Sequence, residues 1–180
     1  MQAPGYLSLH FSEKEAACKG SGKLLPPELR PNAVLLANEV GEVIRDAWGG
    51  PLTPISWYRD PEYNEYLFKK SVERAQKRAY DEAIAAGKTV QQAALASANA
   101  RGGVAKDSQH MTGGAFDIQP RSLADVPDLH RLVLRLWNSK KLPKLGGLGL
   151  YPGWIHVDTF ISAPGHLRQW GGIAFGDEPR

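Results

Sequence analysis

The most informative stretch of this chain is SQHMTGGAFD, residues 108–117. It places an imidazole, His110, and a carboxylate, Asp117, on either side of a glycine pair. Residues seven apart on one straight strand point to opposite faces of a sheet. Gly113 and Gly114 remove that obstacle, because glycine lets the chain turn and re-aim Asp117. Both side-chain types suit zinc, so the spacing fits a metal site, although a polar loop entering a buried strand has the same composition.

A second stretch, WIHVDTF at residues 154–160, alternates apolar and polar residues and predicts a β-strand. Ile155 and Val157 would face the core, and His156 and Asp158 would share the other face. An imidazole beside a carboxylate is typical of a catalytic metal site, where one group binds the metal and the other orients a ligand or handles a proton. An edge strand with an exposed polar face shows the same alternation.

The two stretches together supply two histidines and one aspartate, namely His110, Asp117 and His156. Three protein ligands leave a fourth coordination position open for water, as a catalytic zinc requires. Such a metal lowers the pKa of the water and polarises a substrate carbonyl. The sequence therefore indicates one zinc ion with a hydrolytic role.

Outward from these stretches, the periodicity of apolar residues predicts an α+β fold, in which helices pack on a small, largely antiparallel sheet. Ser12 and Glu15 predict a capping box at the start of a short helix. The glycines of residues 146–149 predict a turn region. The remaining expected elements are a helix from Pro31 to a Gly-Gly-Pro stop at 49–51, strands at 52–58 and 116–119, and a helix at 126–140.

Residues 64–101 are rich in Ala, Lys, Glu, Arg and Gln and predict two helices, with a break at residues 87–89. Between Glu65 and Arg101 there are seven Lys or Arg and four Asp or Glu, so this stretch carries a net charge of +3, equal to that of the whole chain. We expect a solvated helical insertion, residues 65–101, within a single domain. A lid, a wall-binding surface and a partner contact are all open as its role.

The length and composition of the chain exclude several classes of protein. The 180 residues suit one compact domain, and the net charge of +3 favours an anionic partner. No run of five like charges is present, so we expect no nucleic-acid tail. The single cysteine, Cys18, excludes an internal disulfide framework. We see neither a signal peptide at the start nor an apolar run long enough to insert into a membrane.

The pattern S-x-H-x-x-G-x-A-x-D at residues 108–117 resembles a signature of the zinc D-alanyl-D-alanine carboxypeptidases and murein endopeptidases related to the hedgehog signalling domain. Residues 147–152 and then 156–159 resemble the second half of that family's site, and residues 168–170 resemble its basic-aromatic ending. Residues 56–64 resemble the segment of Ser, Arg and Asn before the site. The resemblance covers most of the chain except residues 65–101, and it implies a hedgehog/DD-peptidase-like fold with a helical insertion.

The resemblance also implies roles for individual residues. His110, Asp117 and His156 would bind zinc, and Arg59 would bind a substrate carboxylate, for which a guanidinium fork is well shaped. Three further residues would line the substrate site: Ser108, Gln109 and Tyr151.

The chain departs from the family's pattern at one position of the site. Some relatives carry an acidic base three residues before the last ligand, where this chain has Gly153. Asp158 is the nearest carboxylate, so we assign it the role of base or of a group that supports a ligand.

These expectations converge on a zinc metallopeptidase that cuts peptidoglycan stem peptides or cross-links. A D-Ala-D-Ala carboxypeptidase and a non-catalytic phage structural or wall-binding module of the same fold are the alternatives. The expected partner is peptidoglycan, without nucleic acid or membrane insertion. Because no signal peptide is seen, we expect a phage-lysin-like protein that is made in the cytoplasm and acts at the bacterial cell wall. The sequence says nothing about the oligomeric state.

Overall fold

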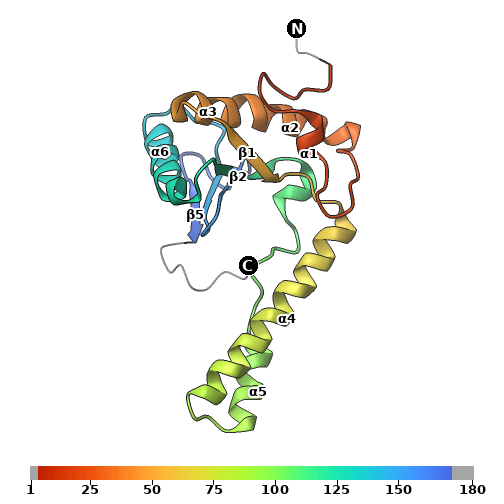
Figure 1. Cartoon of the computed structure of the whole chain (residues 1–180), viewed down its shortest axis with the longest axis vertical. Helices are drawn as coiled ribbons and strands as arrows, with labels where there is room; N and C mark the ends of the chain where they lie inside the picture. The colour runs from red at the N-terminus through yellow and green to blue at the C-terminus, as the bar shows by residue number, and fades with distance from the viewer. Residues whose placement is uncertain (1–3, 172–180) are drawn as a thin grey trace. The chain divides into compact units, whose positions relative to one another are not determined.

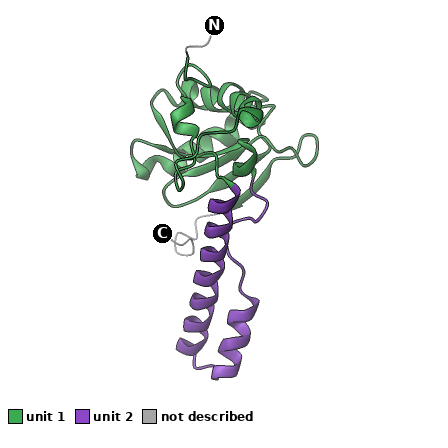
Figure 2. Cartoon of the chain, turned by 90° about the vertical axis from the view of Figure 1, so that its right-hand side faces the viewer, with its two compact units in different colours: residues 1–60, 109–176 green, residues 61–108, 177–180 purple. Residues whose placement is uncertain are grey.

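The computed structural model describes residues 4–171, which divide into two compact units (Figure 2). Within that range, the first unit comprises residues 4–60 and 109–171, and the second comprises residues 61–108. The predicted α+β class is confirmed. That the whole chain is a single domain with an insertion at 65–101 stays a prediction.

A five-stranded sheet forms the centre of the first unit, in the order β1-β2-β4-β3-β5. Three of its strand pairs are antiparallel, and only β3 and β5 run parallel, so the sheet is largely antiparallel as predicted. The strands are β1 (Leu52–Ser56), β2 (Ala115–Pro120), β3 (Gly147–Leu150), β4 (Ile155–Asp158) and β5 (Arg168–Gly171).

The prediction of a turn region at residues 146–149 is wrong, because Gly147–Leu150 is strand β3. The strand lies between β4 and β5 and is buried along its whole length. Glycine weakens the interior of a strand, and where it occurs there it often marks a bulge or the close approach of another group. The neighbouring strands β4 and β5 supply those groups.

Helices and short helical turns complete the first unit (Figure 1). Ser12 and Glu15 form the predicted capping box at the start of α1. In chain order the elements are α1 (Glu13–Ala16), η1 (Pro27–Leu29), α2 (Arg30–Leu36), η2 (Ala37–Glu42), α3 (Val43–Trp48), η3 (Gln109–Thr112), η4 (Leu123–Asp125) and α6 (Val126–Asn138). None of the described helices is long and apolar enough to cross a membrane.

The segments α2, η2 and α3 succeed one another without a break, and Gly49 ends the last of them in the left-handed conformation, with φ 75°. The middle segment, η2, is a π-helix, which takes more residues per turn than an α-helix. The phase of the buried face therefore shifts along this stretch. Ala47 is exposed, whereas Gly41 is buried.

The hydrophobic core of the first unit lies between one face of the sheet and the helices α2, η2, α3 and α6. Phe116 and Ile118 of β2 face this core, together with Ile155 and Val157 of β4. Since side chains alternate along a strand, the residues between them project from the other face. The fold thus fixes which side chains are free to build a site, and His156 and Asp158 are among them.

The second unit is a helical hairpin of α4 (Pro61–Ala85) and α5 (Val90–Asn99), with the predicted break between them. Thr89 begins α5 with a capping box. At the other end of the hairpin, the buried Asn64 donates to the backbone oxygens of Ala105 (3.2 Å) and Lys106 (2.9 Å). This amide therefore ties the start of α4 to the segment that comes after α5.

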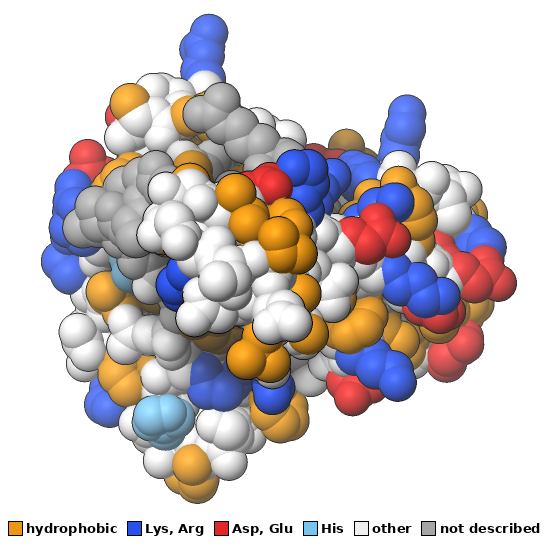
Figure 3. Space-filling model, turned by 90° about the horizontal axis from the view of Figure 1, so that it is seen from below, with side chains coloured by type: hydrophobic (Ala, Val, Ile, Leu, Met, Phe, Trp, Pro, Cys, Tyr) orange, Lys and Arg blue, Asp and Glu red, His pale blue; other side chains and the backbone are white. Residues whose placement is uncertain are grey.

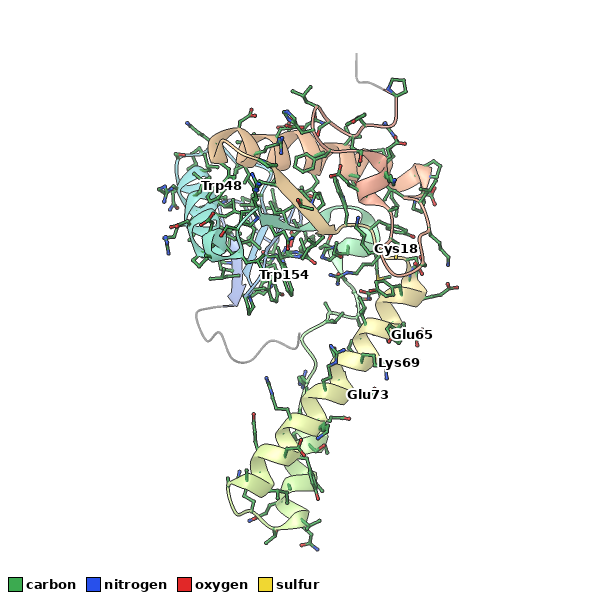
Figure 4. All side chains as sticks on the ribbon, viewed as in Figure 1. Cys18, Trp48, Glu65, Lys69, Glu73 and Trp154 are labelled. Atoms are coloured by element: carbon green, nitrogen blue, oxygen red, sulfur yellow. The ribbon has the colours of Figure 1, made fainter. Side chains whose placement is uncertain are left out.

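Much of the positive charge of α4 is paired along the helix itself. Lys69 contacts Glu65 across one turn (Figure 4), with 2.6 Å between Nζ and Oε1. Three further pairs lie three or four residues apart, namely Lys70–Glu73, Lys77–Asp81 and Arg78–Glu82. Acidic and basic side chains are likewise interspersed on the face of the molecule shown in Figure 3.

Candidate metal centre

Three side chains that the sequence singled out converge on one face of the sheet. His110 comes from η3, Asp117 from β2 and His156 from β4. His110 Nε2 lies 3.2 Å from His156 Nδ1 and 3.3 Å from Asp117 Oδ1, and the latter two atoms are 2.9 Å apart. The three atoms form a group of potential metal ligands within the first unit.

The turn between His110 and Asp117 is built by the glycine pair. Gly113 has φ 73°, a left-handed conformation that glycine adopts without steric cost. Trp57 holds this turn from both sides: its ring nitrogen donates to the backbone oxygen of Gly113 (3.1 Å), and its own backbone oxygen accepts from His110 Nδ1 (2.6 Å). Since Nδ1 is used in this way, Nε2 of His110 faces the other ligands.

The register of the sheet places the rest of the centre in two rows. Asp117 lies opposite His156 across β2 and β4, and Gly149 and Trp170 continue that row into β3 and β5. The next row, two residues along each strand, consists of Ala115, Asp158, Gly147 and Arg168. Residues two apart share a face of a sheet, so both rows point to the same side.

His156 has both ring nitrogens engaged. Nδ1 faces Asp117 and His110, whereas Nε2 lies 3.1 Å from Asp158 Oδ2. Asp158 is 1% exposed, and its other oxygen, Oδ1, accepts from Arg168 Nη2 (2.6 Å) and from the backbone N–H of Phe160 (2.8 Å). The predicted imidazole–carboxylate pair is therefore present, and it lies on a buried strand rather than on an exposed edge.

Asp117 is held through its second oxygen. Arg59 Nη2 donates to Asp117 Oδ2 at 2.9 Å, and Arg59 Nε donates to Ser56 Oγ at 3.0 Å. The register between β1 and β2 shifts between Pro54 and Ser56, which brings Ser56 opposite Asp117. Such irregularities commonly re-aim side chains beside functional sites. Arg59 thus fixes the orientation of the carboxylate and leaves Oδ1 toward the two histidines.

The charges of the centre depend on one another. Burial by itself would raise the pKa of Asp117, but the adjacent His110 and His156 hold that pKa far below its usual range. Burial lowers the pKa of His110. Burial also acts to lower the pKa of His156, yet the hydrogen bonds to Asp117 and Asp158 outweigh it and raise that pKa. The carboxylate of Asp117 is therefore ionised, as a metal ligand must be.

Aromatic rings border the centre next to His156. The ring of Trp170 lies 5.1 Å from that of His156, and Trp170 Nε1 donates to the hydroxyl of Tyr151 at 2.9 Å. Tyr151 in turn stacks on Trp154, with centroids 5.0 Å apart and planes 13° from parallel. A Cβ built at Gly149 would crowd Trp170 and Tyr151, so this glycine lets both rings lie close to the strand.

The sequence connected three other positions with the site. Gln109 belongs to the first unit, where its side-chain oxygen lies 3.4 Å from Thr112 Oγ1. Ser108 is the last described residue of the second unit. At Gly153 a Cβ would meet no described atom within 4 Å. The substrate-binding roles of Arg59, Ser108, Gln109 and Tyr151 stay predictions.

Two residues of β5 support the centre. In the sequence, residues 168–170 resemble a basic-aromatic ending, and that resemblance alone assigns them no role. Arg168 contacts Asp158, and Trp170 contacts His156, both from the edge of the sheet. A signal for them existed, since Arg168 and Trp170 are two apart and would share a face if the segment were a strand. Nothing local indicated that this strand would lie beside β3.

The donor set and its spacing fit zinc. Two neutral imidazole nitrogens and one carboxylate oxygen are among the commonest ligands of catalytic zinc. A tetrahedral zinc with bonds of ~2.0–2.1 Å separates its ligand atoms by about 3.3 Å. The separations of 2.9, 3.2 and 3.3 Å are close to that value. His110, Asp117 and His156 would hold the ion, and each is oriented by a second hydrogen bond, as metal ligands in proteins usually are.

Comparisons with known proteins gave two structural matches. No protein-family model matches the chain, and no curated protein matches it. One matching structure is a mutant of the vancomycin-resistance D,D-pentapeptidase VanY from a VanB-type resistance cassette, in complex with Zn(II). It has a TM-score of 0.37 and 18% identity, over 81% of this chain and 79% of that chain. The other is VanYB in complex with D-alanine-D-alanine, with a TM-score of 0.32 and 17% identity, over 80% of this chain and 76% of that chain.

Proposed function

We propose that this chain is a zinc-dependent peptidase that hydrolyses an amide bond in peptidoglycan stem peptides. One observation carries the proposal: His110 Nε2, Asp117 Oδ1 and His156 Nδ1 lie within 3.3 Å of one another. Two of these residues belong to the stretch 108–117, whose pattern resembles the signature of the zinc D-alanyl-D-alanine peptidases. A scattered set of surface residues would not give three converging donor atoms on one buried face.

The chemistry of the centre divides between metal and protein. A bound zinc supplies Lewis acidity, which polarises the scissile carbonyl and lowers the pKa of water. The protein's own residues hold the ion and keep its surroundings fixed. The side chain of His156 is 11% exposed and those of Asp117 and His110 are 7% and 2% exposed, so solvent reaches the centre mainly at His156.

The contacts of Asp158 favour a supporting role over that of the base. One of its oxygens lies against His156 Nε2, on the side of the ring away from the other ligands, and the second oxygen is bound by Arg168 and Phe160. A general base must reach the proton that it removes, directly or through one water. We therefore propose that Asp158 orients His156. The open space at Gly153 lies where an acidic base would be expected from the family's pattern.

The same open position favours a second candidate function. A chain that binds zinc and peptidoglycan without a base at residue 153 would be a wall-binding module that has lost turnover. Endopeptidase, carboxypeptidase and lysin-like action at the cell wall are finer alternatives within the enzyme class. The scissile bond separates these finer alternatives, whereas turnover separates the enzyme from the binding module.

The test is digestion of purified murein and of soluble stem peptides ending in D-Ala-D-Ala, with mass spectrometry of the products. The zinc-loaded protein is expected to release fragments, and His156→Ala is expected to bind no zinc and release none. Release of the terminal D-Ala identifies a carboxypeptidase, and cleavage of cross-linked dimers identifies an endopeptidase. Zinc binding and murein binding without any product would instead support the binding module, and Gly153→Glu then asks whether an acid alone restores turnover.

A further inference from the structure

Asp158 contacts the His156 ring on the side away from the other proposed ligands, and Arg168 in turn contacts Asp158. Asp158 Oδ2 lies 3.1 Å from His156 Nε2, and Asp158 Oδ1 accepts from Arg168 Nη2 at 2.6 Å. We propose that Arg168 is a positioning residue of the metal centre, acting through Asp158 to keep His156 Nδ1 directed at the metal. The proposal rests on the zinc site of the proposed function and adds a residue from the edge strand β5 to it.

Asp158 needs a cationic partner in order to serve His156. It is 1% exposed, and an ionised carboxylate that is buried without a partner is strongly unfavourable. Arg168 supplies the positive charge, whereas the other donor to the same oxygen is a neutral backbone N–H, that of Phe160. Without Arg168, the backbone N–H of Phe160 would be the one remaining donor to Asp158 Oδ1 among the described contacts, and the carboxylate would no longer be held against His156 Nε2.

Arg168 is itself fixed in place. Its guanidinium carbon lies 5.0 Å from the ring centroid of Phe160 and 5.5 Å from that of Trp170. Nη2 also donates to the backbone oxygen of Phe160 at 3.0 Å. The guanidinium is therefore oriented by contacts independent of Asp158, which is what a positioning group requires.

The strand between Asp158 and Arg168 carries a residue that accommodates the pair. Gly147 is the register partner of both residues, across β4 on one side and β5 on the other. A Cβ built at Gly147 would overlap Asp158 Oδ2 and Arg168 Nη2. The ion pair thus explains why β3 has a glycine in this row, because the two charged side chains occupy the space that a side chain at residue 147 would need.

A carboxylate on the outer nitrogen of a metal-binding histidine fixes the tautomer and the ring orientation and raises ligand basicity. Loss of such a supporting contact typically weakens metal binding on the order of 10–100-fold. Arg168→Gln is therefore expected to raise the zinc Kd by that factor. Arg168→Lys, which keeps the charge, is expected to recover part of the affinity.

The experiment measures the zinc Kd by competition with a chromophoric chelator, and the visible absorption spectrum of the cobalt(II) form. The matched control is Arg131→Gln, because Arg131 pairs with Asp128 on α6 and the two side chains are 58% and 62% exposed. Arg168→Gln is expected to change both the Kd and the cobalt spectrum, whereas Arg131→Gln is expected to change neither. A role of Arg168 confined to holding β5 would lower the melting temperature without moving the cobalt spectrum.

The proposal is overturned if Arg168→Gln has the zinc Kd and cobalt spectrum of the wild type, or if the wild type binds no zinc. If Arg168→Gln does not fold, Gly147→Ala and Arg168→Lys decide instead. Weaker zinc binding by folded Gly147→Ala, with Arg168→Lys in between, supports the proposal, and unchanged binding in both overturns it. Turnover is not needed for these readouts, so a wild type that binds zinc but cleaves nothing contradicts the proposed function and leaves this test intact.

Discussion

At the scale of single residues, two roles of Asp158 can be told apart by experiment: it orients His156, or it acts as the general base. Both of its oxygens are engaged, and its pKa is held down: burial acts to raise it, but the bonds to His156, Phe160 and Arg168 prevail. If Asp158 orients His156, Asp158→Asn should weaken zinc binding by roughly tenfold or more. The zinc Kd of the purified variant measures this. An unchanged zinc Kd with a rate lower by on the order of a hundredfold would make Asp158 the base instead.

A second residue-scale prediction concerns Glu42, which ties the N-terminal segment to η2. Its Oε1 accepts from Ser8 Oγ (2.5 Å) and from the backbone N–H of His10 (2.8 Å), and its Oε2 contacts His10 Nδ1 (2.7 Å). Burial acts to raise the pKa of Glu42, but these hydrogen bonds outweigh it and lower the pKa below the ordinary value of 4.5.

Because the folded pKa of Glu42 is below its unfolded value, the ionised carboxylate stabilises the fold above pH 4.5. That stabilisation is lost as the pH falls through the lower folded pKa. Glu42→Gln should therefore lower the free energy of unfolding by about 1 kcal/mol at pH 7, and by less as the pH falls below 4.5. Urea unfolding at several pH values measures the difference, with the exposed Glu39→Gln as control. A difference that does not depend on pH would contradict the assignment.

At the scale of elements, the π segment η2 places a glycine against two aromatic rings of the core. A Cβ at Gly41 would lie 2.9 Å from Phe11 Cε2 and 3.2 Å from Phe116 Cζ. These two rings also pack edge to face, with centroids 5.6 Å apart, so neither can move away freely. Gly41→Ala should therefore destabilise the fold by about 1–3 kcal/mol, in spite of the higher helix propensity of alanine.

Urea unfolding at pH 7 measures this effect, and Gly50→Ala is the matched control. A Cβ at Gly50 would lie 3.6 Å from Trp48, an ordinary contact, so that variant should stay within about 0.5 kcal/mol of the wild type. A gain of stability in Gly41→Ala would mean that the rings yield more readily than their packing implies.

At the scale of the whole molecule, the described residues of the helical hairpin contribute nothing to the hydrophobic core cluster. All residues of the hydrophobic core cluster lie in the first unit, and the hairpin is closed at its base by Asn64. We predict that replacing residues 65–101 with a short Gly-rich linker leaves a folded, zinc-binding protein. Circular dichroism and the zinc Kd check this, and loss of folding would show that the hairpin is needed to complete the fold.

The same variant tests what the hairpin does. Residues 65–101 carry a net charge of +3, which would attract an anionic wall, although four basic residues of α4 are paired along the helix. Activity on whole cell walls is expected to fall more than activity on soluble stem peptides, and the difference should shrink at high salt. Equal losses on both substrates would point to a role of the hairpin at the zinc site.

Features that depend on near neighbours along the chain could be predicted from the sequence. The glycine pair at 113 and 114 predicted a turn that brings His110 and Asp117 together, and η3 and β2 confirm it. The alternation of residues 154–160 predicted the shared face of His156 and Asp158. Such signals are local, because a turn or a strand face is set by a few consecutive residues.

Features that depend on contacts across the sheet became visible in the folded chain alone. From its residue type alone, Gly147 was predicted to lie in a turn region. In the structure it lies in strand β3, where Asp158 and Arg168 occupy the space that a side chain at this position would need. Arg168 comes from β5, at the edge of the sheet, and lies beside β3 through a parallel pairing that no short stretch of sequence encodes. The three side chains that converge at the centre could therefore be picked out from the sequence, and their role as metal ligands stays a prediction. The charged support behind His156 depends on strand order and register.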